Sequence, residues 1–320
     1  MNLSRLDREL LPALEALRPR VDPIDDPAGA RAELLEKLGA GAPGHPSVER
    51  RDEEIDGPDG NTVRVRLYLP RERGVDPAPG LYWIHGGGFV MGSIEMDDAL
   101  CDSYAARFGC VICSVDYRLA PEHPYPAGIE DCYAGLVWFF DQARRLDIDG
   151  SRIGIGGISA GGGLTAATTL LARDRGRVQV AFSLAVCAQL DDRHITSSST
   201  SIHDSRVWDT RTSRRAWKAY LSGVNGDVPP YAAPARATDL AGLPPTFLLV
   251  GDLDVFCDEN VEYARRLIAA GVPTELHVYP GAYHGFEVLA PGARISRSAI
   301  AARENALARF LGVPAGTADR

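Results

Sequence analysis

The sequence predicts an α/β fold in which a mostly parallel central sheet is flanked by helices. Three observations predict it. Short apolar runs such as 81–85 (LYWIH) and 110–115 (CVICSV) are nearly continuous, as in strands buried on both faces. Segments with helical periodicity alternate with these runs, which indicates a parallel sheet covered by helices. The length of 320 residues suits one large domain of this class.

The elements follow in order along the chain. Strands are predicted at 63–69, 81–84, 110–115, 152–156, 178–186, 246–251 and 275–279. Helices are predicted at 97–108, 128–146, 160–173, 259–270 and 294–311. Leucines that recur every three or four residues predict one more helix near the N-terminus, over 3–17, which Pro19 ends. The result is one α/β domain that spans residues 1–320.

Two segments do not join this alternation, and we expect them to form a helical cap. One is the N-terminal stretch of about 1–50, and the other runs from about 191 to 231 with a helix around 211–222. Open α/β sheets place their sites at the carboxyl edge, and long insertions often cover such sites. Trp208, Trp217 and Tyr220 lie in the second segment. They either line a pocket or pack the cap together, and the sequence leaves both interpretations open.

Composition excludes several classes of function. Lys and Arg number 34 against 43 Asp and Glu, so the net charge of −9 argues against partners such as nucleic acid or an anionic membrane. The N-terminus lacks the apolar core of a secretory signal, and no apolar run has transmembrane length, so we expect a cytoplasmic protein. The six cysteines are expected as buried thiols. Cys110 and Cys113 have CxxC spacing but no second pair, so no metal site is expected.

The stretch 156–163 (GGISAGGG) has two interpretations. A phosphate loop of the GxGxxG type would start at Gly154 and Gly156, but its third glycine position holds Ser159. A Walker loop would need a lysine, and this stretch contains none. A nucleophile elbow needs GxSxG between a strand and a helix, and residues 157–161 (GISAG) provide it. We therefore identify Ser159 as the candidate nucleophile.

The serine needs a base, an acid and donors for an oxyanion. Residues 85–89 (HGGGF) follow a strand upstream of the elbow and match a known oxyanion-hole pattern. Acid and base should follow the serine in that order. The loop after strand 246–251 offers four carboxyl groups, at Asp252, Asp254, Asp258 and Glu259. His284 follows the last strand among turn-forming residues, so it is the candidate base. The other histidines are expected to be structural or solvated: His45, His85, His123, His194, His203 and His277.

From about residue 60 to 312 the chain resembles the hormone-sensitive-lipase-like branch of the α/β-hydrolases. The resemblance rests on 85–89 (HGGGF), 116–127 (DYRLAPEHPYPA), 157–162 (GISAGG), 239–246 (DLAGLPPT), 254–259 (DVFCDE) and 283–286 (YHGF). It implies the α/β-hydrolase fold with a helical cap, Ser159 as nucleophile, Asp254 as acid and His284 as base. It also places oxyanion donors on Gly86, Gly87, Gly88 and Ala160. It further implies that Asp258 is a structural second acid and that 116–127 orients loops near the site.

The sequence departs from this family at two points. Ile158 stands where Asp is common, and 254–257 (DVFC) replaces Asp-Pro-Leu-Arg, although the acid itself is retained. The expected function is a serine carboxylesterase that hydrolyses short- to medium-chain acyl esters through an acyl-enzyme. An amidase or lactonase on the same fold and a non-catalytic ligand-binding protein remain alternatives. The resemblance implies a small-molecule ester as substrate, no metal or organic cofactor, and a homodimer.

Overall fold

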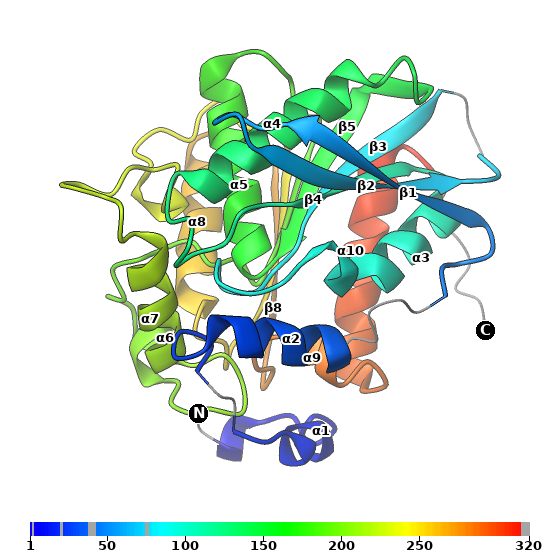
Figure 1. The fold of residues 1–320 in the computed structure, drawn as a ribbon. Coiled ribbons are helices and arrows are strands. Elements are labelled where there is room, and N and C mark those ends of the chain that lie inside the picture. Colours follow the sequence, from blue (N-terminus) through cyan, green and yellow to red (C-terminus); the bar gives the residue numbers. More distant parts are fainter. Residues whose placement is uncertain (2, 20–21, 38–42, 74–76, 315–320) are drawn as a thin grey trace.

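A computed structural model describes residues 1, 3–19, 22–37, 43–73 and 77–314 of the chain, and its centre is one eight-stranded sheet (Figure 1). The strands are β1 (Val48–Asp56), β2 (Thr62–Pro70), β3 (Ala78–Ile84), β4 (Val111–Asp116), β5 (Ile148–Ile158), β6 (Ser183–Val186), β7 (Thr246–Gly251) and β8 (Thr274–Tyr279). Their order in space is β1-β2-β4-β3-β5-β6-β7-β8. β2 runs antiparallel to both β1 and β4, and all the other neighbouring strands are parallel, which confirms the mostly parallel sheet.

Helices cover both faces of this sheet. The long ones are α3 (Asp98–Phe108), α4 (Ala127–Asp141), α5 (Ala160–Arg175), α8 (Cys257–Ala269) and α10 (Arg294–Leu311). Buried side chains of α3 and α10 share one apolar cluster, and those of α4 and α5 belong to another. Residues of α8 join those of α5 in a third cluster on the same face as α4. Figure 1 shows α3 and α10 together on the face opposite α4 and α5.

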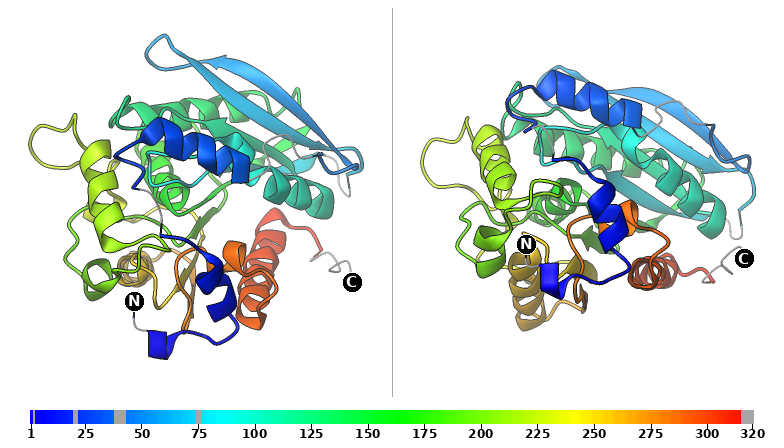
Figure 2. Two further views of the ribbon diagram at one scale, coloured as in Figure 1. Left: turned by 60° about the horizontal axis from the view of Figure 1, so that its bottom comes forward. Right: turned by 90° about the horizontal axis from the view of Figure 1, so that it is seen from below.

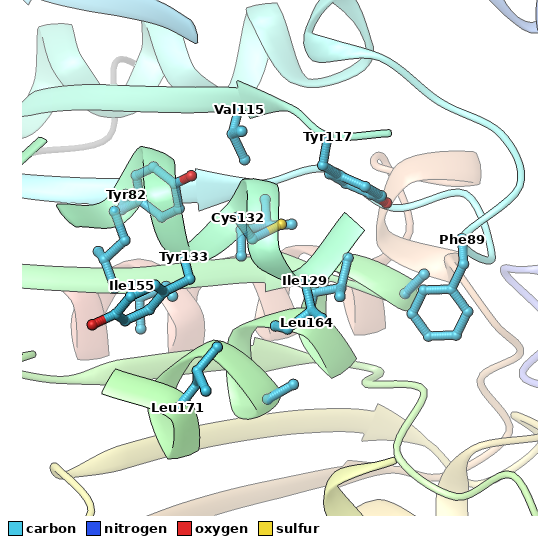
Figure 3. Packing of buried hydrophobic residues seen from close by; sticks show 14 of the residues in the cluster. Tyr82, Phe89, Val115, Tyr117, Ile129, Cys132, Tyr133, Ile155, Leu164 and Leu171 are labelled. Atoms are coloured by element: carbon cyan, nitrogen blue, oxygen red, sulfur yellow. The ribbon is translucent and has the colours of Figure 1, made fainter. Parts of the chain in front are cut away.

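Buried side chains from β3, β5, α4 and α5 interlock to form the largest part of the core. Tyr82 and Ile155 from the sheet meet Cys132 of α4 and Leu164 of α5, as Figure 3 shows. Strands with both faces covered bury nearly every residue; all seven residues of β3 are buried. This packing makes the sheet a rigid base for the loops that follow its strands.

Further helices gather at the end of the molecule where β5, β7 and β8 terminate. They are η1 (Leu3–Arg5), α1 (Leu11–Ala16), α2 (Pro27–Lys37), α6 (Ser197–Ser201), α7 (Thr210–Tyr220) and α9 (Phe286–Leu289), and η2 (Ile94–Asp97) and η3 (Pro234–Arg236) complete the helices of the described residues. Figures 1 and 2 show α1 and α2, in blue, at the same end as the yellow-green α7. Arg215 of α7 pairs with Asp22 at 2.5 Å and with Asp25 at 2.6 Å, which joins the N-terminal stretch to the later insertion.

The structure departs from the sequence-based elements in several places. The helix predicted at 128–146 ends at Asp141. The strand predicted at 178–186 is formed only by Ser183–Val186, because residues 178–182 run as an irregular approach to the sheet. The helix predicted at 3–17 is divided into η1 and α1, although Leu6, Leu10 and Leu14 are all buried as their spacing indicates. Strand β1 and helix α2 were not predicted. Only Val48 and Ile55 of β1 are buried, and the residues between them are all charged. Its sequence therefore resembles that of a polar loop.

All six cysteines are buried as free thiols, as predicted: Cys101, Cys110, Cys113, Cys132, Cys187 and Cys257. Burial raises the pKa of each, to about 12 for Cys110 and Cys257. They therefore stay neutral and act as small apolar side chains. Within the described residues, no helix is both long enough and apolar enough to cross a membrane.

Candidate active site

Ser159 occupies the turn between β5 and α5. Its backbone angles are φ 60° and ψ −121°, a conformation that residues with a side chain rarely adopt. Three backbone hydrogen bonds hold it there. The Ser159 N–H donates to the carbonyl of Val186 at 2.8 Å, and the Ser159 carbonyl accepts from the amides of Gly163 and Gln189 at 3.0 and 3.1 Å. The strained turn is thus fixed by the end of β6 and by the first turn of α5.

His284 connects the serine to an acid. Its Nδ1 lies 2.8 Å from Oδ2 of Asp254, and its Nε2 lies 2.9 Å from Oγ of Ser159. A carboxylate only accepts hydrogen bonds, so Nδ1 carries the proton and Nε2 is free to accept from the serine hydroxyl. Asp254 follows β7 and His284 follows β8, two adjacent strands of the sheet. The sheet therefore brings together three residues that lie far apart in the sequence.

Asp254 is buried more deeply than Ser159. Asp254 is only 1% exposed, and its second oxygen accepts the backbone N–H of Phe256 at 3.0 Å. The ring of Phe256 meets the His284 ring edge-on, with centroids 5.2 Å apart. Ser159 is 8% exposed, which leaves its hydroxyl at the boundary of the protein interior. Phe256 is a supporting residue that the sequence analysis missed; its only signal was its position two residues after Asp254.

The glycine loop 86–88 lies against the elbow. A Cβ on Gly86 would come within 2.9 Å of the Ile158 carbonyl, so the loop and the elbow are in close contact. Gly87 and Gly88 have φ values of 114° and 64°, which glycine adopts without strain. Among the described residues, the amides of Gly87, Gly88 and Ala160 donate to no other group. The Ala160 amide also stands at the N-terminus of α5, where the helix dipole favours negative charge.

His85 supports this loop from behind. It is completely buried, stacks on Tyr117 with ring centroids 4.3 Å apart, and its Nδ1 lies 2.8 Å from the carbonyl of Gly86. Burial lowers the pKa of His85, so its ring stays neutral. The Tyr117 hydroxyl donates to the His85 carbonyl at 3.1 Å, and Ala120 N–H donates to that of Phe89 at 3.0 Å. The segment 116–127 thus orients the glycine loop, as the resemblance implied.

Two other carboxyl groups in the acid loop, those of Asp258 and Glu259, accept hydrogen bonds from the backbone of residues 190–198. Asp258 accepts the Ser198 N–H at 2.8 Å, and the Ser198 hydroxyl accepts the Asp258 N–H at 3.0 Å, so this pair joins α8 to α6. Glu259 accepts the amides of Leu190 and Asp191 at 2.6 and 3.3 Å. Burial raises the pKa of Glu259 well above its usual range. Asp258 has the structural role that the resemblance implied for it.

Cys187 lies beneath the histidine–aspartate pair. Its sulfur, an Asp254 oxygen and a ring nitrogen of His284 all lie within 4.8 Å of one another, the one such cluster of metal-ligand types in the described residues. Two of these residues already bond to each other, and the third is a neutral thiol. The hydrogen bonds among Ser159, His284 and Asp254 account for this cluster without a metal.

Aromatic side chains cover the glycine loop. A Cβ on Gly88 would lie 2.2 Å from the ring of Trp208, so Trp208 rests directly on that glycine. Phe89 stacks on Tyr220 with centroids 4.2 Å apart and meets Trp217 at 5.0 Å. Trp208, Trp217 and Tyr220 are each at most 3% exposed. The aromatic residues of the predicted cap therefore pack against one another and against the loop that holds Phe89.

Comparisons with known proteins agree on one family. A family model described as alpha/beta hydrolase fold matches residues 81–288. The chain is 36% identical over 284 residues to esterase LipI of Mycobacterium tuberculosis, covering 88% of each chain. It is 38% identical over 247 residues to carboxylesterase NlhH of the same species, covering 74% of this chain and 75% of that protein. A solved bacterial heroin esterase superposes with a TM-score of 0.92 at 43% identity, covering 97% of this chain and 99% of the other.

Proposed function

Because the chain belongs to the alpha/beta hydrolase fold family and is a carboxylic ester hydrolase, we propose that it cleaves short- to medium-chain acyl esters through a Ser159–His284–Asp254 triad. The observation that carries the proposal is the His284 ring, which lies within hydrogen-bond distance of both Ser159 and Asp254. The order of these residues along the chain, nucleophile then acid then base, is the order expected for this fold.

The proposed reaction has two steps. Nε2 of His284 accepts the Ser159 proton as Oγ attacks the ester carbonyl, and Asp254 stabilises the imidazolium that forms. The amides of Gly87, Gly88 and Ala160 would bind the negative oxygen of the tetrahedral intermediate, with Gly86 supporting the loop. The histidine then returns the proton to the departing alcohol. Water attacks the acyl-enzyme by the same route, which releases the acid and restores the serine.

The proposed limit on acyl length rests on the packing around the glycine loop. Trp208 lies against Gly88, and Phe89, Trp217 and Tyr220 fill the space beside it. A long acyl chain on this side would have to displace buried aromatic rings, which is costly in a packed interior. We therefore propose that short and medium acyl groups are the preferred substrates.

A chain-length series of nitrophenyl esters tests both parts of the proposal. We expect kcat/KM to be highest for short and medium acyl groups and to fall for long ones. Ser159→Ala should lower kcat/KM by about a thousandfold or more, because the nucleophile is lost. Full activity of Ser159→Ala would refute the triad. A parallel series of matched amides distinguishes an amidase, for which amide and ester turnover would be comparable.

We further propose that residues 1–50 and 191–231 form a cap over this site. The proposal rests on Trp208, which touches Gly88 of the oxyanion loop, and on Arg215, which ties α7 to Asp22 and Asp25. Arg31 of α2 also donates to the carbonyls of Val90 and Ala120 beside the same loop. Both segments therefore contact the loop region or each other.

A further inference from the structure

Arg5 and Asp7, near the start of the chain, contact the loop that carries His284. The Asp7 N–H donates to the carbonyl of Gly281 at 3.0 Å. A Cβ on Gly281 would lie 2.6 Å from the Asp7 nitrogen and 2.7 Å from the Arg5 carbonyl, so no side chain separates the two segments. Leu10 is completely buried and belongs to the same apolar cluster as Tyr283. The N-terminal segment therefore packs on the histidine loop rather than only on the exterior of the cap.

Asp252 joins this contact to the loop that carries the acid. One of its carboxylate oxygens accepts the Gly281 N–H at 2.6 Å, and the other pairs with the guanidinium of Arg5. The backbone of the same region adds two hydrogen bonds. The Asp252 N–H donates to the carbonyl of Tyr279 at 2.9 Å, and the Leu253 N–H donates to the carbonyl of Ala282 at 3.0 Å. A single carboxylate thus connects the acid loop, the histidine loop and the N-terminal segment.

We propose that Asp252 is a positioning residue that sets the distance between Asp254 and His284, and that Arg5 holds its carboxylate in place. The inference rests on the triad proposed above. Asp252 precedes Asp254 by two residues, and Gly281 precedes His284 by three, so the Asp252–Gly281 bond fixes both loops close to the reacting groups. Displacement of a catalytic group by about 1 Å can cost about a hundredfold in rate.

The location of these side chains separates this role from a contribution to folding. The Arg5 side chain is 56% exposed and that of Asp252 is 21% exposed, so their ion pair contributes little to overall stability. It can still orient the loops, because orientation requires only that one of several nearby arrangements is favoured. Loss of the pair should therefore change turnover more than it changes folding.

Three variants test the proposal. Asp252→Ala removes both bonds and should lower kcat about tenfold, with KM within about twofold of the wild type, because the triad rather than substrate binding is disturbed. Asp252→Asn keeps an oxygen that can accept the Gly281 N–H, so it should recover most of the lost kcat. Arg5→Ala should lower kcat about two- to fivefold. The rate at which a serine-reactive phosphonate modifies Ser159 should fall in parallel with kcat, most in Asp252→Ala.

Glu262→Ala is the matched control, because it removes a carboxylate from an exposed ion pair with Arg265 on the helix that follows the acid loop. It should have wild-type kcat. Wild-type kcat in Asp252→Ala, or equal losses in Asp252→Asn and Asp252→Ala, would overturn the proposal. If Asp252→Ala does not fold, Arg5→Ala decides alone, and an unchanged kcat in that variant overturns the proposal. Ser159→Ala tests the triad separately, because this substitution removes the proposed nucleophile and leaves Asp252 and its bonds to Gly281 and Arg5 in place.

Discussion

Ser159 keeps its strained backbone because the residues two positions before and after it, Gly157 and Gly161, have no side chains to accommodate. A Cβ on Gly157 would lie 2.5 Å from the carbonyl oxygens of Gly161 and Ile84. A Cβ on Gly161 would lie 2.1 Å from the Ile84 oxygen and 2.6 Å from that of His85. These atoms belong to the backbone of β3, of His85 directly after it and of the elbow itself, so they cannot move aside as a flexible side chain could. Glycine is required here by close approach of the backbone.

Gly161→Ala should therefore damage both folding and activity. The added methyl group has to push β3 away from the elbow, and overpacking of this kind costs about 1–3 kcal/mol or more. We expect kcat/KM to fall at least about a hundredfold, because Ser159 and the oxyanion loop both shift. Urea unfolding and ester kinetics measure the two effects. Gly150→Ala is the control, since nothing lies within 4 Å of its Cβ position, and a similar loss in that variant would contradict the explanation.

At this scale the sequence was sufficient for some residues and not for others. Ser159 and His284 could be proposed as nucleophile and base because GxSxG and a histidine after the last strand are local patterns. The acid could not be derived locally, because four carboxyl groups share one short loop and differ only in what they contact. Asp254 contacts His284, Asp258 contacts Ser198, and Asp252 contacts Gly281. Such contacts join segments far apart in the chain, so no local pattern reveals them.

At the scale of elements, ion pairs join β2 to η2 and to β1, in addition to the sheet hydrogen bonds between β1 and β2. Arg64 of β2 contacts Glu95 of η2 at 2.8 Å and Asp116 at 2.8 Å. Arg66 contacts Asp52 of β1 at 2.6 Å. This alternation of charges explains why β1 could not be predicted: its outward face is stabilised by partners on other elements, whereas the sequence shows only a hydrophilic run. The resemblance to known hydrolases began after this strand and gave no help.

Glu95 makes the stability of this corner depend on pH. Burial raises the pKa of Glu95, but hydrogen bonds, chiefly those from Arg64, outweigh this effect and lower the pKa to about 2, against 4.5 for a free side chain. A carboxyl group with a lowered pKa stabilises the folded state above about pH 4.5, and its contribution is lost as the pH falls towards 2. The contribution is modest, because the network is partly exposed.

Glu95→Gln should therefore lower the free energy of unfolding by about 1 kcal/mol at pH 7, and the difference from the wild type should shrink as the pH falls from 5 towards 3. Urea unfolding at several pH values measures it. Glu54→Gln, which removes an exposed carboxylate from β1, is the control and should have little effect at any pH. A difference that grows towards low pH would have the wrong sign for this explanation.

At the scale of the whole molecule, the proposed cap combines two segments that lie far apart in the sequence, residues 1–50 and 191–231. Asp22 and Asp25 precede the sheet, whereas Arg215 follows six of its strands, and the ion pairs between them close the structure over one end. The sequence set both segments apart because neither continues the alternation of strands and helices. It could not show that they contact each other, since no pattern in either one encodes its partner.

Arg215→Ala should loosen the proposed cap. We expect KM for nitrophenyl esters to rise about threefold or more, with a smaller change in kcat, because the triad does not contact Arg215. Lys218→Ala removes an exposed cation from the same helix and should leave both constants near their wild-type values. An unchanged KM in Arg215→Ala would argue against a cap that encloses the substrate.

The burial of all six native thiols has a practical consequence for experiments on the proposed cap. A cysteine introduced at an exposed point of α7 would react with a maleimide dye far faster than the six shielded ones, so the natural residues need not be replaced first. With a second introduced cysteine and a second dye on α10, the distance between α7 and α10 could be followed by energy transfer in single molecules.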